Sequence, residues 1–373
     1  MSRLATLAVF FLVMALAAGC MSGPPPLPDA VVTQLAELDM RGEREAGRYG
    51  VFVMSPDGFQ MRQIYGGERL RNYVRVSPDG QWVVYVEYTA DVNEDGVINE
   101  ADYQSAEIGL MRIDGTEARL LTRNDHIDLY PSWAPDGQHI LFVSDRDSVS
   151  EEFVALNLYV MDRDGQRVVN ITNTLDVTET DPSWSGTSIA FIRLTPGEEE
   201  RVQAIWVMEC DVENLAACGE AGSPRQLTSP MFEQESEVGY IFGDYGPRIS
   251  PDGKTVAFYR HQNESWSIGG SFPIGDFDVI TIPLEGGAET LVSRGDEADL
   301  APAWSPDGRR FAFSVIAPPD SEEGYIDERG WRWPVPGAGR WAEAALQADA
   351  RLGSGGRAWR QPRAVADLFG GVG

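Results

Sequence analysis

Three observations predict an all-β protein, namely a β-propeller of four-stranded antiparallel blades. A turn of sequence Ser/Ala-Pro-Asp-Gly recurs along the chain, and a short apolar run follows four of its five copies. A second pattern follows this apolar run in the sequence. It consists of another apolar run, an acidic turn that ends in glycine, and a closing run that tends to end in Leu-Thr or Ile-Thr. The residue just before the first turn stands at positions 76, 133, 184, 249 and 304, so successive units are 51 to 65 residues apart. A four-stranded blade takes roughly 40 to 45 residues, and each unit therefore holds one blade with its loops.

The N-terminus has the layout of a secretory signal peptide, which we expect over residues 1–19. An uncharged and almost entirely apolar run extends from Leu4 to Ala18, which suits a signal peptide and is too short for a stable transmembrane helix. The residues up to Cys20 resemble the bacterial lipobox, although Ala17 stands where leucine is usual. The resemblance implies that Cys20 is lipidated, whereas an ordinary cleaved signal that contains a cysteine is the alternative. Residues 20–47 begin with a proline-rich stretch and are expected to form a tether.

The body of the propeller is expected over residues 48–317. The first half of the unit occurs in full four times and once in shortened form, at Ser77–Gly80, Ala134–Gly137, Ser250–Gly253, Ser305–Gly308 and Trp184–Gly186. In each full turn proline presets φ, aspartate bonds back to the backbone and glycine supplies positive φ, which predicts a tight turn between antiparallel strands. The apolar runs behind the turns suit strands that are buried between neighbouring sheets.

Both halves of this unit, recurring in order, resemble the repeat of TolB-type propellers, which occurs in TolB and in the propeller domains of dipeptidyl and prolyl peptidases. The resemblance implies a closed ring of blades that serves as a platform for protein partners. Residues 48–65 match only the second half of the unit, and residues 301–316 only the first half. We therefore expect the N-terminal strands to pair with the last blade and close the ring. This arrangement has five recognisable blades, and the six blades of TolB are the alternative.

The tail over residues 318–373 departs from the repeat. It is rich in Gly, Ala, Arg and Trp and shows no strand alternation. A disordered extension and a frameshifted end both fit this low-complexity composition, and its one candidate for order is a helix over Trp341–Leu352. A frameshifted end would also explain why a sixth blade is missing.

Two cysteines remain once Cys20 carries lipid. Cys210 and Cys218 flank a short loop, and we expect them to form a disulfide in an oxidising compartment, with two free thiols as the alternative. The formal net charge is -28, from 30 basic and 58 acidic residues. Binding of phosphates needs a basic surface, so a nucleic-acid partner is excluded. An acidic surface suits cationic partners or divalent metal, and it also serves solubility alone.

One motif predicts a cofactor, namely calcium. The segment 91–102 resembles the twelve-residue calcium loop of EF-hands, with oxygen ligands at loop positions 1, 3 and 5 and glycine at position 6. Its last position is aspartate instead of the usual glutamate, which is closer to the loops of dockerins. The ligands that this pattern assigns are Asp91, Asn93, Asp95, Val97 through its carbonyl, Asn99 directly or through water, and Asp102. An acidic hairpin loop without a bound ion is the alternative, and a bound ion would be structural because it pins a long loop.

No common catalytic motif occurs in the sequence. Gly-x-Ser-x-Gly, His-Glu-x-x-His, Gly-x-x-x-x-Gly-Lys and Cys-x-x-Cys are all missing. Of the three histidines, we expect His126 and His139 to be surface or strand residues, while His261 begins a long loop and is the strongest candidate for chemistry. Aromatic residues that could line one face of the ring are Tyr240, Phe242, Tyr245, Trp266 and Phe272. We therefore predict a binding protein with no catalytic residues.

The function that these features favour is a monomeric protein-interaction platform on the cell envelope, either periplasmic or on the cell surface. Its partner would be an unknown envelope protein, and its contact with the membrane would be the lipid on Cys20. A propeller that binds a glycan or another small ligand is the second class, since acidic and aromatic loops with calcium could hold a sugar. An enzyme, or the accessory propeller of a peptidase or lyase system, is the third.

Overall fold

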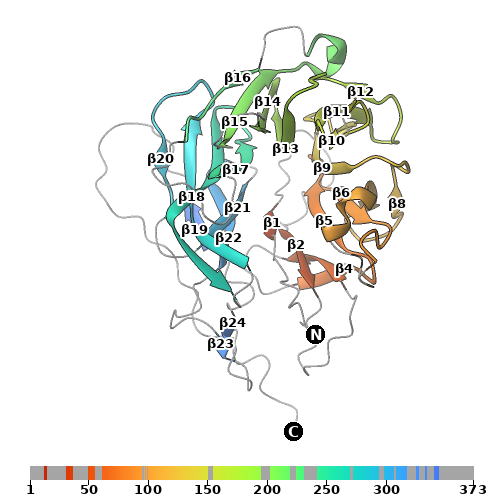
Figure 1. Ribbon diagram of the computed structural model, residues 1–373, viewed down its shortest axis with the longest axis horizontal. Helices are drawn as coiled ribbons and strands as arrows, with labels where there is room; N and C mark the ends of the chain where they lie inside the picture. Colours follow the sequence, from red (N-terminus) through yellow and green to blue (C-terminus); the bar gives the residue numbers. More distant parts are fainter. Residues whose placement is uncertain are drawn as a thin grey trace.

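The computed structural model of the chain is nearly all β and confirms the predicted fold class (Figure 1). Within the described residues, helical structure is limited to the short 3₁₀ helices η1 (Glu100–Ser105) and η2 (Val212–Ala217). The residues that the structure describes are 12–14, 31–36, 49–54, 61–94, 96, 98, 100–149, 154–194, 202–218, 224–230, 242–268, 272–293, 298–305, 308–316, 325–326, 332–333 and 340–343.

Four groups of four strands repeat one antiparallel arrangement, and each group is a blade. In every group the strands pair in chain order, and the first strand is the innermost. The first of these blades comprises β5 (Arg71–Val76), β6 (Trp82–Tyr88), β7 (Ala106–Arg112) and β8 (Arg119–Leu120). The next comprises β9 (Asp128–Trp133), β10 (His139–Ser144), β11 (Asn157–Asp162) and β12 (Val169–Asn170). The third comprises β13 (Thr178–Ser185), β14 (Ser188–Leu194), β15 (Val202–Glu209) and β16 (Arg225–Gln226). The fourth comprises β17 (Phe242–Ile249), β18 (Thr255–Ile268), β19 (Phe272–Pro283) and β20 (Thr290–Leu291).

Two further groups of strands complete the ring, so the described strands form six groups. One antiparallel sheet comprises β1 (Leu12–Met14), β2 (Val31–Ala36), β3 (Tyr49–Met54) and β4 (Met61–Gly67). The last group comprises β21 (Ala298–Trp304), β22 (Arg310–Ile316) and β25 (Arg340–Glu343). A separate hairpin comprises β23 (Tyr325–Ile326) and β24 (Arg332–Trp333).

The expected closure of the ring is wrong. β3 pairs with β2 and β4, and β22 pairs with β21 and β25, so the N-terminal strands do not join the last blade. The physical reason is that other strands already occupy the two open edges. β2 (Val31–Ala36) pairs with β3 and β25 (Arg340–Glu343) pairs with β22, although neither carries a sign of the repeat. The first and last groups instead pack against each other, because β1 contacts β21 and β22. The described strands therefore favour six blades, and residues 340–343 form a strand where a helix was expected.

The predicted signal peptide, tether and tail stay predictions. Most of residues 1–48 and 317–373, Cys20 among them, lie outside the described residues. Within the described residues, no helix is long and apolar enough to cross a membrane.

The Ser-Pro-Asp-Gly turns join the first and second strands of the blades. Ser77 Oγ donates to Asp79 Oδ1 at 2.5 Å and accepts from the backbone N–H of Trp82 at 2.9 Å. Gly80 has a φ of 70°, and its N–H donates to the Ser77 carbonyl at 2.8 Å. The turn at Ser250–Gly253 makes the same three bonds at its own residues. The residues that define the repeat in sequence therefore satisfy one another within the turn.

The hydroxyl residue that ends each unit, threonine in three blades and serine in the fourth, also has a structural role. The Thr122 hydroxyl accepts a hydrogen bond from the backbone N–H of Ile108, in the third strand of the same blade, at 2.8 Å. The equivalent bonds in the next three blades run from Leu158 to Thr172, from Ile205 to Thr228 and from Val279 to Ser293. This side-chain bond ties the end of each short fourth strand to the third strand.

Glycine is required in the acidic turn between the third and fourth strands. Gly115 has a φ of +86°, and a Cβ there would lie 1.9 Å from the carbonyl oxygen of Ile64 in the preceding blade. Gly165 has a φ of +79°, and a Cβ there would lie 2.7 Å from the Leu121 carbonyl oxygen. This turn therefore packs directly against the end of the blade before it.

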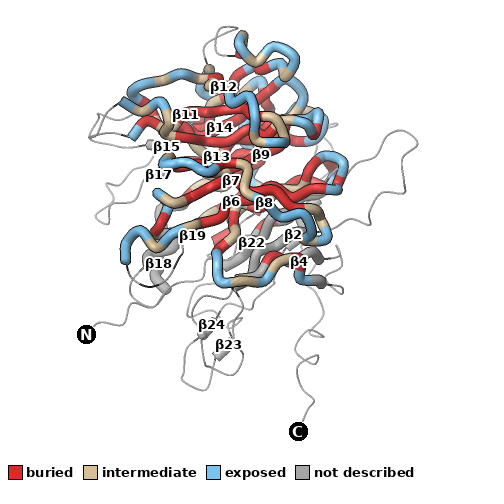
Figure 2. The backbone as a smooth tube through the Cα atoms, turned by 90° about the vertical axis from the view of Figure 1, so that its right-hand side faces the viewer, coloured by how far each residue is buried: buried red, intermediate tan, exposed pale blue. Residues whose placement is uncertain are grey.

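The hydrophobic core lies between neighbouring blades (Figure 2). One cluster joins Val84 and Ile108 of one blade to Phe142 of the next. Trp133 Nε1 donates to the Arg75 carbonyl in the preceding blade at 3.0 Å, and Trp304 Nε1 donates to the Arg248 carbonyl at 2.8 Å. The tryptophan before the turn thus bonds two blades as well as filling the space between them.

The two ends of the propeller differ in their connections. The connections from first to second and from third to fourth strands lie at one end, which we call the turn face. They are short, except that β15 ends at Glu209 and β16 begins at Arg225. The connections from second to third strands and from blade to blade lie at the other end, which we call the loop face. Two of these loops are long, since β6 ends at Tyr88 and β7 begins at Ala106, while β10 ends at Ser144 and β11 begins at Asn157.

Cys210 and Cys218 form a disulfide on the turn face, with Cα atoms 4.4 Å apart. The bond closes the loop that holds η2, and both residues are buried. We expect Cys210→Ser combined with Cys218→Ser to lower the free energy of unfolding by about 2 kcal/mol, because the unfolded chain gains the freedom of an open loop. Urea unfolding with and without a reductant measures this. The reductant should destabilise the natural chain to the level of the double variant, and a chain indifferent to both changes would contradict the expectation.

Candidate functional site

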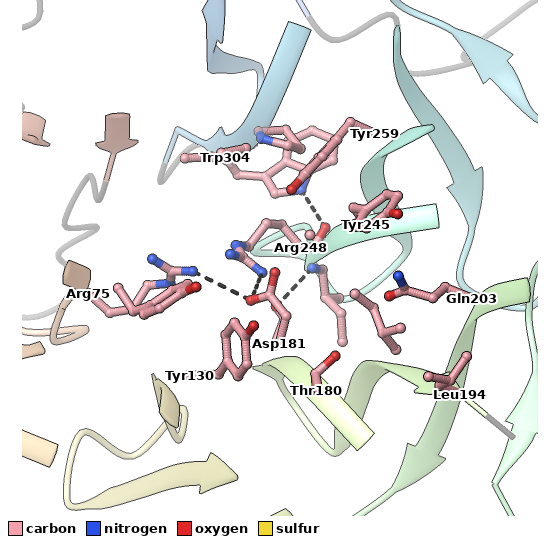
Figure 3. A pocket seen from close by; sticks show the side chains of 18 of the residues that line it. Arg75, Tyr130, Thr180, Asp181, Leu194, Gln203, Tyr245, Arg248, Tyr259 and Trp304 are labelled. Carbon is pink, nitrogen blue, oxygen red and sulfur yellow. Dashed lines mark hydrogen bonds and ion pairs between the residues drawn. The ribbon is translucent and has the colours of Figure 1, made fainter. Parts of the chain in front are cut away.

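A pocket lies on the propeller axis, where the innermost strands of five blades meet (Figure 3). Its described residues come from β5, β9, β13, β17 and β21, with additional side chains from β14, β15 and β18. The cavity volume is about 430 Å³, which is typical of small-molecule sites. Thr178, Leu194 and Gln203 lie at the loop-face ends of their strands, so the pocket extends toward the loop face.

A bulge in each innermost strand shapes this pocket. The pairing of the first and second strands shifts register once in each of the five blades. The residues at these shifts have φ values between 46° and 57° and all line the pocket; they are Tyr73, Tyr130, Asp181, Gly246 and Ala301. Positive φ costs a non-glycine residue roughly 1–3 kcal/mol, and bulges re-aim side chains. The strain at four of these positions is therefore the cost of turning the residue toward the axis.

The charged residues of the pocket form a group of two arginines and one aspartate. Arg248 Nη1 donates to Asp181 Oδ1 at 3.0 Å, and Arg75 Nη2 lies 3.6 Å from the same oxygen. All three side chains are about 16% exposed. Among the described lining residues the pocket therefore holds one positive charge in excess, in a chain whose formal net charge is -28.

The backbone that carries Arg248 is fixed by its neighbours in both directions. The Arg248 carbonyl accepts from Trp304 in the following blade, and the N–H of Ile249 donates to Ser183 Oγ in the preceding blade at 3.1 Å. The guanidinium also donates from Nη1 to the Pro247 carbonyl at 2.7 Å. These bonds hold the side chain in place before any ligand arrives.

Aromatic rings form much of the remaining wall. Tyr73 and Tyr130 meet edge to face with ring centroids 4.6 Å apart, and Tyr245 stacks on Tyr259 at 5.5 Å. Trp304 lies beside Tyr259 in Figure 3. Burial raises the pKa of Tyr130 and of Tyr259, so both stay neutral near pH 7.

Burial, followed by the charge of Arg248, lowers the pKa of Arg75 to about 9. The guanidinium is held in a site that disfavours its charge, because it is buried and lies near a second arginine, and Asp181 offsets this only in part. A further anion within reach of both arginines would relieve this imbalance.

The predicted calcium loop lies on the loop face between β6 and β7. Asp102 is fully buried, and its Oδ1 accepts from the backbone N–H groups of Val92 at 2.7 Å and Asn93 at 3.2 Å. Asp91 Oδ2 accepts from the N–H of Gly96 at 2.8 Å, and Gly96 has a φ of +87°.

The first and last predicted calcium ligands thus both bond to the backbone of the same loop. The side chains of Asp95, Val97 and Asn99 lie outside the described residues. Within the part of the chain that is described, no three acidic, histidine or cysteine side chains are grouped to hold a metal ion. The calcium ligands therefore remain predictions.

The histidines occupy separate places. His126 lies 3.3 Å from Asp145, and His139 on β10 lies 2.6 Å from Asp136. His261 is buried on β18 against the Phe277 ring, with centroids 4.9 Å apart, and burial lowers its pKa. None of the three is among the described residues that line the axial pocket.

Sequence reasoning found one pocket residue, Tyr245, and missed the charged group. Arg75 and Arg248 each stand one position before the residue that precedes the turn, and Asp181 stands three positions before it. The shared register of Arg75 and Arg248 in the repeat indicates equivalent places in two blades but does not by itself indicate the axis. The side chains of Phe242, Trp266 and Phe272 and the residue Tyr240 lie outside the described residues.

No family model matches the chain. A protein of Agrobacterium fabrum named "Uncharacterized protein Atu1656" is 25% identical over 156 residues, which cover 40% of this chain and 49% of that protein. The matched part therefore spans about half the length of this relative.

The solved structures similar to the chain are propellers of low sequence identity. The putative TolB from Agrobacterium tumefaciens has a TM-score of 0.52 at 15% identity, over 80% of this chain and 85% of that one. TolB from Acinetobacter baumannii has a TM-score of 0.48 at 17% identity, over 80% of this chain and 57% of that one. The likeness to the Agrobacterium tumefaciens structure shows the fold, namely that the chain is a β-propeller. The Acinetobacter baumannii structure is matched over little more than half its length.

Proposed function

We propose that the protein is an exported β-propeller, anchored to the cell envelope through Cys20, which binds a protein partner with its loop face. The observation that supports this most is where apolar side chains are exposed. Five of the seven exposed large hydrophobic residues that the structure describes lie on loops of this face; they are Val92, Tyr103, Val149, Val154 and Leu175. Exposed apolar side chains gathered on one surface are typical of interaction sites.

These five residues belong to neighbouring blades. Val92 and Tyr103 lie on the loop between β6 and β7, and Val149 and Val154 lie on the loop between β10 and β11. Leu175 lies on the connection from β12 to β13. A partner that covers two adjacent blades would bury all of them.

Calcium would stiffen this surface. In the proposed site Asp91, Asn93, Asp95, Asn99 and Asp102 supply side-chain oxygens and Val97 its carbonyl, a set that suits a hard cation. The hydrogen bonds of Asp91 and Asp102 to loop backbone support the proposal, because Asp102 ties the end of the loop to its beginning and Asp91 ties the beginning to Gly96 in the middle. The ion would pin Val92 and Tyr103, which lie within or beside the ligand sequence.

Calcium should raise the free energy of unfolding by about 2.7 kcal/mol at a concentration 100 times its Kd, and Asp91→Ala should abolish this gain. Asp164→Ala is the matched control, because that carboxylate is 82% exposed on a turn-face loop. Calorimetric titration of the metal-free protein and thermal unfolding with and without calcium give the measurement. Equal calcium heats from the natural chain and from Asp91→Ala would refute the site.

The partner itself is tested by crosslinking and pull-down from solubilised envelopes, using the lipidated full-length protein in calcium and in chelator. A discrete protein partner, recovered less in chelator, is expected. Leu175→Ser should weaken recovery, while Val168→Ser, a residue exposed near the turn face, should not. Absence of any specific partner under both conditions would overturn the proposal and would favour a small-ligand propeller.

A further inference from the structure

We propose that the axial pocket is a binding site for a small ligand that carries one carboxylate and an apolar body. The carboxylate would lie against Arg75 and Arg248, and the body would pack on the tyrosine and tryptophan rings. This site lies on the axis, whereas the partner surface is formed by loops of the face toward which the pocket extends.

The two guanidiniums provide the donors for such a group. A guanidinium has five N–H donors and matches a carboxylate in a two-bond fork. Among the described residues, both hydrogen bonds of the Arg248 guanidinium come from Nη1, and Arg75 donates from Nη1 to the Val74 carbonyl. Neither arginine makes the two-bond fork with Asp181, which reaches both of them through a single oxygen.

Asp181 therefore acts as a built-in competitor for the ligand. Its carboxylate occupies part of the space between the arginines and neutralises one of the two charges. The remaining positive charge is shielded from solvent, so an anion placed there interacts more strongly than it would at the surface. Burial had already made the charge of Arg75 unfavourable.

Size and overall charge limit the ligand class. A cavity of about 430 Å³ suits a small molecule. The formal charge of -28 repels polyanions at long range, and one excess positive charge balances a single carboxylate. The wall supplied by Tyr130, Tyr245, Tyr259 and Trp304 favours an aromatic or otherwise apolar body.

The test is isothermal titration of the full-length protein with benzoate, phenylacetate and indole-3-acetate, each against its own carboxamide. At least one carboxylate should bind, and its carboxamide should bind roughly 10- to 100-fold more weakly, which is the usual effect of losing a charged hydrogen bond. Carboxylates and carboxamides that bind equally, or no binding by any probe at millimolar concentration, would overturn the proposal.

Two variants change the affinity in opposite directions. Arg248→Gln should weaken carboxylate binding roughly 10- to 100-fold, whereas Asp181→Asn should tighten it, because the competitor loses its charge. Arg112→Gln, outside the pocket and 35% exposed, should leave the affinity unchanged. If the Arg-Asp-Arg group were purely structural, Asp181→Asn would bind the carboxylate no more tightly than the natural chain does. An unchanged affinity in Asp181→Asn would therefore refute the site, even if Arg248→Gln fails to fold.

Discussion

Replacing Arg193 by methionine is expected to lower the free energy of unfolding by about 3–5 kcal/mol at neutral pH. Arg193 Nη2 donates to Glu179 Oε1 at 2.6 Å, and the Glu179 side chain is 0% exposed. Methionine keeps most of the volume of arginine but leaves this carboxylate in the protein interior without its counter-charge. Urea unfolding followed by tryptophan fluorescence measures the loss.

The same variant should recover stability in acid. Burial raises the pKa of Glu179 above its ordinary value of 4.5, even with Arg193 beside it. A carboxyl group with a raised folded-state pKa binds its proton more tightly in the folded state, so its contribution to stability increases as the pH falls toward 4.5 and decreases as the pH rises. Without Arg193 the folded-state pKa rises further. The deficit relative to the natural chain should therefore be full at neutral pH and shrink between neutral pH and 4.5.

Two further variants separate charge from packing. Arg167→Met removes an arginine that is 83% exposed and lies 3.7 Å from Asp162, and it should change stability by no more than about 0.5 kcal/mol. Adding Glu179→Gln to Arg193→Met removes the uncompensated charge and should restore more than half of the loss. A loss in Arg193→Met that is independent of pH and not restored would show that packing, not charge, sets the effect.

Phe142→Ala is the second change with a large expected effect, a loss of about 3–5 kcal/mol. Phe142 is fully buried on β10 and belongs to the cluster that joins two neighbouring blades. Its ring lies 5.7 Å from that of Tyr159 and beneath the Arg146 guanidinium, which is 5.1 Å from its centroid. Truncation to alanine removes contacts on both sides of the blade interface and leaves a cavity between two stiff sheets that cannot close it.

The measurement is again the urea midpoint, with Val149→Ala as the control. Val149 is 81% exposed on the loop face, so its truncation should leave stability unchanged. Phe142→Leu should lose less than half as much as Phe142→Ala. If the free energy of unfolding of Phe142→Ala lay within about 1 kcal/mol of that of the natural chain, the close packing of Phe142 between the two blades would be contradicted.

The repeat was predictable because its signals are local. Ser77, Asp79 and Gly80 bond to one another within a single turn, so their types and spacing alone indicate where the first two strands of a blade meet. Thr122 likewise bonds to the third strand of its own blade.

The closure of the ring was not predictable in this way. Which strand occupies an open edge depends on pairings between distant parts of the chain, and β1, β2 and β25 carry no mark of the repeat.

The axial pocket escaped prediction for a related reason. Tyr73 and Asp181 line the axis because a bulge places them in the left-handed region, and strict alternation along a strand does not reveal where a bulge occurs. Arg75 and Asp181 belong to different blades, so their pairing follows from the ring as a whole. Residue types alone gave no reason to place these charges together.

The most direct test of the loop face as the partner surface is site-specific photocrosslinking in intact envelopes. A benzophenone amino acid is placed in turn at Tyr103, Val149 and Leu175 on the loop face, and at Val168 and Leu291 near the turn face and on the outer strand β20. All five positions are exposed and apolar, so the probe itself is equally tolerated. We expect adducts of one partner protein from the first three positions and none from the other two. Adducts from Val168 or Leu291 alone, or from no position, would contradict it.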